Sequence, residues 1–355
     1  MSGVAKRKKA PVEFNIGLMV NKEGRPALDG RFAIPQLLNT SAALSVDASV
    51  SSLIAHSFNV RYALPLASAW LFSAEAVKQV NDYTFSSSFT ESVTGTRFAW
   101  ARGPHTIGLD AHLRDIHPVI GGGAKSMASE QVRRVALRSV KTAVNYQFVV
   151  DKVMRTPHAM SGSKFAFFAD FAGLFGDVRL TKLESSFIRY TPVAKGIVWG
   201  SRVGAGAIAS KHQTPIQDRF FLGGTVEEKS SLRGFAVRSV GPAGKRIATT
   251  PSFDHLGGDV YVSLDNSLSF PVYSKDGIDV RGTVFGQVGS LIPSLHSKAI
   301  PELGRSVRAS VGAGIVVPIG AVGTMELTIA KPVYGATTSD TQQMLQIGIR
   351  VTNMH

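Results

Sequence analysis

A strict alternation of apolar and polar residues recurs along this chain and limits the folds that it can adopt. In residues 343–351, which read QMLQIGIRV, every second residue from Leu345 to Val351 is apolar, and the residues between them are polar or glycine. Residues 12–20, 259–270 and 305–317 follow the same period of two. This period is that of a β-strand with one apolar and one polar face. The pattern therefore predicts an all-β fold.

Segments of this kind fill the chain. They lie at 12–20, 26–34, 43–52, 56–66, 69–78, 91–101, 104–113, 132–150, 163–172, 177–191, 195–208, 259–270, 279–289, 305–317, 322–332 and 343–351. About 16 strands of roughly ten residues match a single antiparallel barrel across a membrane. No repeat and no Gly/Ser linker divides the chain, so we expect one transmembrane β-barrel over residues 12–355 after a basic tail over residues 1–11.

Two further observations favour a membrane barrel. No segment approaches the ~18 consecutive apolar residues of a membrane-spanning helix, so a membrane location requires a barrel. The apolar faces are rich in Ala, Val and Leu, as lipid contact allows, and the opposite faces carry Arg, Ser, Gly and Gln, as a wet lumen would. Alternation alone does not exclude a soluble β-sandwich, which remains an alternative.

Charge and composition exclude several classes of function. The 39 basic and 25 acidic residues give a net charge of +14, which suits nucleic acid, anionic lipid or a basic lumen. The only basic run is Lys6–Lys9, without interleaved aromatic residues, so we expect no nucleic-acid partner. The absence of cysteine excludes disulfides and thiol catalysis. The histidines are scattered and no catalytic motif is present, so we expect no enzyme activity, metal or cofactor.

One segment between the predicted strands 11 and 12, residues 209–256, does not alternate. It is far longer than a hairpin loop, and its apolar residues require burial. These are Phe220, Phe221, Leu222, Leu232, Phe235 and Val237. A barrel of about 16 strands is wide enough to hold a loop, so we expect this segment to fold back into the lumen.

The sequence of this loop resembles a known family. The residues that carry the resemblance are Phe221, Leu222, Gly223 and Gly224, then Leu232, Arg233, Gly234 and Phe235, and then GP at 241–242. It continues through LGGD (256–259), FPVY (270–273), FGQVGSL (285–291), SVGAGIVVPIG (310–320) and the last strand. Together these segments resemble the outer-membrane insertase superfamily. The N-terminal EFNIGLMVNKEG and HSFNVRYALPL resemble its mitochondrial branch, the central subunit of the sorting and assembly machinery.

The resemblance implies an insertase that folds β-barrel precursors into the mitochondrial outer membrane without nucleotide or metal. Its implied partners are β-barrel precursor proteins, accessory subunits of the sorting and assembly machinery, and outer-membrane lipid. Most members carry soluble polypeptide-transport-associated (POTRA) domains before the barrel. Only about 11 residues precede the first predicted strand here, so we expect no such domain.

The resemblance also assigns roles within the loop. The loop arginine of the family, here Arg233, reaches across the lumen to an acidic or polar group, and a buried guanidinium needs such a partner. The candidate partners are Asp259, Glu326 and Gln287, the last at a position where bacterial members often have aspartate. Gly234 is expected to permit a close turn, and Phe235 to anchor the loop by packing.

The expected insertion site is a lateral gate between the first strand (12–20) and the last strand (343–351). A poorly paired seam can open and offer unpaired backbone groups to an incoming strand. The gate residues are Phe14, Ile16, Gly17, Leu18, Gln346, Gly348, Ile349 and Val351. The two glycines are equally consistent with ordinary lumen-facing positions. A passive porin-like channel for anions or metabolites is the alternative function, although a wide pore has no use for a plugging loop.

Overall fold

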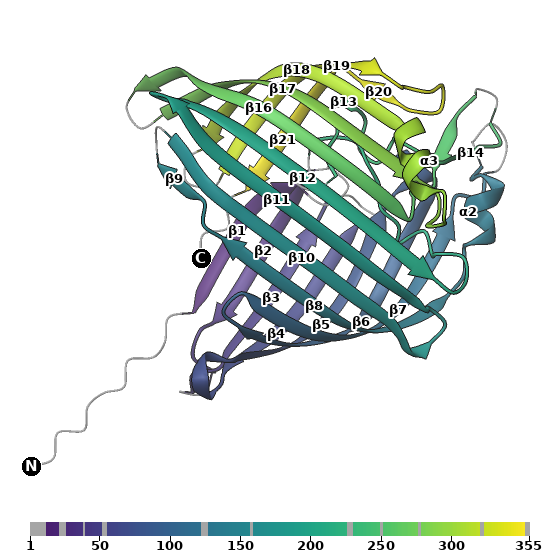
Figure 1. Cartoon of the computed structure of the whole chain (residues 1–355). Coiled ribbons are helices and arrows are strands. Elements are labelled where there is room, and N and C mark those ends of the chain that lie inside the picture. Colours follow the sequence, from purple (N-terminus) through teal and green to yellow (C-terminus); the bar gives the residue numbers. More distant parts are fainter. Residues whose placement is uncertain are drawn as a thin grey trace, which may run out of the picture.

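Seventeen strands form one antiparallel sheet that curves into a barrel (Figure 1). The computed structural model describes residues 12–20, 26–37, 40–51, 55–121, 127–156, 159–225, 230–248, 251–275, 278–319 and 323–351. The barrel strands are β1 (Glu13–Val20), β2 (Pro26–Ile34), β3 (Ala43–Val50), β4 (His56–Pro65), β5 (Leu71–Asp82), β6 (Phe89–Arg102), β7 (His105–Pro118), β8 (Ser139–Asp151), β10 (Ala159–Gly176), β11 (Leu180–Ala194), β12 (Ile197–Ser210), β16 (Val260–Lys275), β17 (Ile278–Ile292), β18 (Val307–Ile319), β19 (Gly323–Tyr334) and β21 (Leu345–Val351). The three-residue β9 (Met154–Thr156) only extends the edge of β10.

The strand count confirms the predicted barrel of about 16 strands, with the long loop between its eleventh and twelfth strands, β12 and β16. Burial along the strands is that of a membrane barrel. On β16, Val262 and Leu264 are 41% and 39% exposed on the outer face, whereas Ser263 and Asp265 are buried on the inner face. An outer face of exposed aliphatic residues is suited to lipid. The soluble β-sandwich alternative is therefore wrong.

The two ends of the barrel differ. One end, called the loop end here, carries the long connections with α1 (Thr84–Ser87), α2 (Glu130–Arg134) and α3 (Ala299–Arg305) and the entry to the segment between β12 and β16. The other end, the turn end, carries mostly short connections, the start of β1, the end of β21 and the 3-10 helix η2 (Ala67–Ala69). None of the helices in the described part of the chain is long and apolar enough to cross a membrane.

The predicted strand 132–150 begins too early, because its first residues form α2. Ser129 caps this helix by accepting a hydrogen bond from the Val132 backbone N–H at 3.5 Å, and Val132 is fully buried beneath the loop end. Strand β8 starts only at Ser139. The prediction for residues 343–351 also needs correction, because Gln342–Gln343 form a separate short strand, β20, and β21 begins at Leu345.

Residues 211–259 form the excursion between β12 and β16, and we call them the lumen loop. The described part of this loop contains three short strands, β13 (Gly234–Phe235), β14 (Ala243–Lys245) and β15 (Phe253–His255). Most of the loop's predicted apolar residues are buried, and several join Ile208, Tyr261 and Leu291 of the wall in one cluster. The members from the loop are Phe220, Leu222, Leu232, Phe235 and Val240. The loop is therefore packed against the inside of the barrel, as its composition predicts. The basic tail over residues 1–11 lies outside the described residues.

Candidate functional site

The segment Leu232–Phe235 lies at the centre of the lumen loop and is shaped by glycine. Gly234 has φ of +88°, a conformation that side chains disfavour. Gly223, in the facing part of the loop, has φ of +124°, and a Cβ there would lie 2.2 Å from the Ala236 carbonyl oxygen. Two glycines at these positions let the loop double back on itself and bring Arg233 to the barrel wall.

Arg233 forms ion pairs with two strands. Its guanidinium lies 3.0 Å from a Glu326 carboxylate oxygen on β19 and 3.4 Å from Asp265 on β16. It also lies 4.5 Å from the centre of the Phe285 ring on β17. Arg233 and Asp265 are buried and the Glu326 side chain is only 15% exposed, so the pairing offsets the desolvation of these charges. Of the predicted partners, Glu326 contacts the guanidinium directly, and Asp265 is a partner that the sequence reasoning missed.

Asp259 does not pair with Arg233. It accepts a hydrogen bond from the Thr214 hydroxyl at 2.9 Å and lies 3.7 Å from Arg219. Burial raises the pKa of Asp259, and these two partners oppose that rise. The prediction fails because Asp259 lies one residue before β16 at the loop end. Asp265 is six residues further along, roughly 20 Å away along the strand and therefore deeper in the barrel.

Two glutamines hold the backbone of this loop segment. The Gln287 side-chain oxygen accepts from the Arg233 backbone N–H at 2.6 Å, so this predicted partner binds the main chain and not the guanidinium. The Gln346 amide on β21 makes two bonds, accepting from the Gly234 N–H at 3.0 Å and donating to the Phe235 carbonyl at 2.7 Å. In addition, β13 pairs with β20, immediately before the last strand. The loop is thus attached to the last strand through its backbone.

A second anchor fixes the start of the loop to the opposite wall. Asp218 makes a two-bond contact with Arg114 of β7, at 3.0 and 3.1 Å, and lies 2.6 Å from the Lys141 amine of β8. Lys141 also binds Asp170 of β10 at 2.7 Å. Burial alone would raise the pKa of Asp218, but Lys141 and Arg114 outweigh it and hold that pKa well below its ordinary value. Sequence reasoning missed this anchor, although Asp218 directly precedes the Arg219–Gly224 motif.

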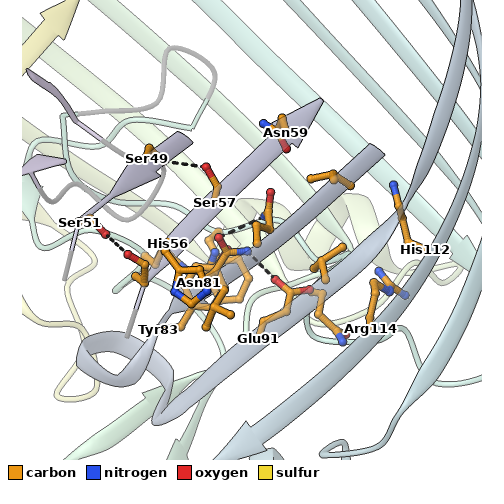
Figure 2. Close-up of a pocket in the computed structure, with 18 of the residues that line it drawn as sticks. Ser49, Ser51, His56, Ser57, Asn59, Asn81, Tyr83, Glu91, His112 and Arg114 are labelled. Carbon is orange, nitrogen blue, oxygen red and sulfur yellow. Dashed lines mark hydrogen bonds between the residues drawn. The ribbon is translucent and has the colours of Figure 1, made fainter. Parts of the chain in front are cut away.

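The loop leaves part of the lumen open. A cavity of about 970 Å³ lies between the loop and the wall, where it is lined by residues of β3 to β7 and by Lys182 and Glu184 of β11. Figure 2 shows Asn81, Glu91, His112 and Arg114 lining this cavity from neighbouring strands. Arg238 of the loop also lines it, with its guanidinium 3.5 Å from the Phe221 ring centre and 4.1 Å from that of Tyr83. The loop therefore leaves a pocket in the lumen that is lined by both polar and apolar side chains. The described residues contain no cluster of three or more His, Asp or Glu that could hold a metal ion.

The seam lies between β1 and β21, which are neighbours in space. Among the described residues, β1 pairs with β2 and β21 pairs with β19, but no ladder joins β1 to β21. Of the predicted gate residues, Phe14 is 67% exposed, Gln346 is bound to the loop, and Gly348 faces Thr225 of the loop, where a Cβ would lie 2.9 Å from the threonine hydroxyl. The side chains of the other predicted gate residues lie outside the described set. These are Ile16, Gly17, Leu18, Ile349 and Val351.

Comparison with known proteins gives consistent matches. A family model described as the Omp85 superfamily domain matches residues 32–350. The sorting and assembly machinery component 50 homolog of Mus musculus is 27% identical over 240 residues, covering 64% of this chain and 48% of the relative. A SAM50-like protein of Schizosaccharomyces pombe is 31% identical over 177 residues, covering 46% of this chain and 34% of the relative. The chain spans about half the length of the curated relatives it matches, or less.

A solved structure extends the match in fold. BamA from Haemophilus ducreyi lacking POTRA domains 1–3 superimposes with a TM-score of 0.78 at 18% sequence identity. The alignment covers 96% of this chain and 70% of that chain. The likeness therefore includes the whole barrel.

Proposed function

Because this chain belongs to the Omp85 superfamily, we propose that it is a membrane insertase, which folds β-barrel precursors and inserts them through the seam between β1 and β21. We further infer that it is an outer-membrane β-barrel of the mitochondrial branch, and its similarity to sorting and assembly machinery component 50 homologs supports this. The proposed setting is accordingly the mitochondrial outer membrane, and the proposed partners are barrel precursors and accessory subunits of an assembly machinery. We infer that no catalytic chemistry is involved, because strand addition forms hydrogen bonds and breaks no covalent bond.

The observation that supports this function most directly is the unequal pairing at the seam. Strand β21 is held by β19 on one side and by the lumen loop through Gln346. Strand β1 has a ladder on its β2 side and none with β21 among the described residues. An edge with unpaired backbone groups binds an incoming strand by main-chain hydrogen bonds that depend little on sequence. Each added strand then has its backbone groups satisfied before it meets lipid.

The porin-like alternative is not favoured. The lumen loop is anchored to the walls on both sides of the barrel and occupies the space that a wide channel requires. A passive pore gains nothing from a loop that is bound to the last strand.

Site-directed crosslinking tests the proposal. The chain has no cysteine, so a crosslink formed through a single cysteine introduced along β1 identifies the position of the contact. A β-barrel precursor arrested during insertion should crosslink through its C-terminal strand to β1 positions, and equivalent cysteines along β6, in the middle of the wall, should give no product. A disulfide that closes β1 onto β21 should block precursor release. Insertion at the normal rate with the seam closed would refute the lateral gate.

A further inference from the structure

A short helix lies outside the barrel and takes no part in the lumen loop or the seam. α3 (Ala299–Arg305) belongs to the connection between β17 and β18 at the loop end, and it packs against β16 and β17 (Figure 1). Its Ala299 and Leu303 side chains contact Val260 and Ile292. Both of these wall residues are buried, with 7% and 0% of their surface exposed.

The wall residues beneath α3 belong to the lipid-facing surface. Val260 and Ile292 are paired neighbours on β16 and β17. Val260 shares a face of its strand with Val262 and Leu264, which are exposed on the outside of the barrel, because residues two apart point the same way. The helix therefore covers the outer wall at the point where the lipid-facing surface meets the loop end.

A polar contact holds the helix in place there. Ser290 is paired with Val262 and so lies in the same outward-facing row. Its hydroxyl donates a hydrogen bond to the Leu303 carbonyl at 2.7 Å. A hydroxyl facing hydrocarbon needs such a partner, and the helix supplies it. This places α3 at the boundary of the hydrocarbon region.

The exposed residues of this segment are mainly aliphatic and basic, and its one carboxylate, Glu302, lies 3.1 Å from His296 of the same segment. Ile300 is 83% exposed and Leu295 is 48% exposed. Lys298 and Arg305, at either end of the helix, are also exposed. Aliphatic side chains beside cations are typical of segments that lie in the membrane interface, where the apolar groups enter the acyl region and the cations meet anionic headgroups.

We propose that residues 295–305 form an interfacial binding site for anionic phospholipid. Ile300 and Leu295 enter the edge of the hydrocarbon, and Lys298 and Arg305 bind the phosphate groups of the headgroups. The occupant is lipid because the helix directly continues the lipid-facing surface of β16 and β17 and because its flanking charges complement anionic headgroups. The site depends on the barrel lying in a bilayer and is independent of the proposed insertase activity.

Site-directed spin labelling tests the depth of the helix. Ile300→Cys and Ile247→Cys each give one labelled site in this cysteine-free chain. Ile247 is the matched control, an exposed isoleucine that bridges to Met127 in the part of the loop end above the lumen. In phosphatidylcholine vesicles containing phosphatidylglycerol, the label at position 300 should be more accessible to oxygen than to a water-soluble nickel complex, with the reverse at position 247. If the label at position 300 is as accessible to nickel as the label at position 247, the helix lies in water and the proposal is wrong. The exposed apolar residues of the helix would then be available to a protein partner.

A second measurement tests headgroup binding. Energy transfer from a donor at position 300 should report enrichment of acceptor-labelled phosphatidylglycerol over labelled phosphatidylcholine. Lys298→Gln and Arg305→Gln should each reduce this enrichment by about five-fold, while Arg134→Gln on α2 serves as the control and should leave it unchanged. Both substitutions are at exposed positions, and heat-modifiable gel migration checks that each variant folds. Enrichment that persists in the double variant would refute the assignment of the two cations.

Discussion

The ion pairs of Arg233 give the sharpest test of how the lumen loop is held. Arg233→Ala removes a side chain that is 9% exposed and leaves two carboxylates, Asp265 and Glu326, whose side chains are 9% and 15% exposed. Asp265 keeps a second cation, Arg202, at 3.5 Å. Glu326 keeps only the Thr328 hydroxyl, at 3.1 Å, among the described contacts. Most of the destabilisation should therefore arise at Glu326.

The size of the effect follows from the cost of an uncompensated buried charge. Breaking a buried ion pair costs about 3–5 kcal/mol, and the remaining contact of Asp265 with Arg202 puts the expected loss at the low end, about 3 kcal/mol. Adding Glu326→Gln to Arg233→Ala removes the unpaired charge and should restore about 2 kcal/mol of it, the coupling expected for contacting residues.

The assay is urea unfolding of the barrel in phosphatidylcholine vesicles, followed by heat-modifiable gel migration, with proteolysis of the loop measured in parallel. Arg31→Ala is the control, since Arg31 of β2 pairs with Asp47 of β3 at 3.5 Å and both side chains are well exposed, by 53% and 33%. It should cost less than about 1 kcal/mol. If Glu326→Gln gives no recovery in the Arg233→Ala background, unpaired charge is not the cause and the reasoning is wrong.

Three further perturbations test other parts of the site. Asp218→Asn should lower the unfolding free energy by about 3–5 kcal/mol, because Lys141 and Arg114 lose a buried negative charge. New protease cleavage should appear in residues 211–217, and an uncleaved loop would contradict the second anchor. Gly348→Ala should lower the unfolding free energy by about 1–3 kcal/mol, because the added methyl group clashes with Thr225. Adding Thr225→Ala should restore this loss in the same urea titration. Burial lowers the pKa of His255 to about 4, so the unfolded chain alone takes up a proton as pH falls from about 6.5 toward 4. The unfolding free energy should fall by up to about 3 kcal/mol over that window, and His255→Gln should flatten the pH profile.

The wall of the barrel was predictable from the sequence because each strand meets two uniform environments. Lipid outside and a polar lumen inside impose a period of two on every strand, so 16 patterned segments correspond to the 16 barrel strands. The prediction fails where that constraint ends. Residues 132–138 lie outside the strands of the wall. The first of them form a helix, because Ser129 caps its N-terminus and Val132 is buried.

The partners of the loop were only partly predictable. Alternation assigns each residue to a face but not to a depth, so Asp259 and Glu326 were both candidates although only Glu326 lies at the level of Arg233. One signal was available: Asp265 is directly paired with Gln287, so aligning the two adjacent strands brings an acidic residue to the level of a predicted partner. The Asp218 anchor had no such signal, since the path of a loop across a lumen is set by packing and not by a period.

The contacts of the lumen loop explain why the seam has two unlike edges. The last strand is fixed at its loop-end half, because Gln346 is bound to Gly234 and Phe235 and because β20 pairs with β13 just before it. These bonds use backbone groups of the loop, and the loop is in turn fixed to the far wall by Asp218. Displacing β21 therefore requires the loop to release it, whereas exposing the edge of β1 requires no ladder to break among the described residues. An incoming strand should pair with β1 first, while β21 remains attached to the loop until that pairing has formed.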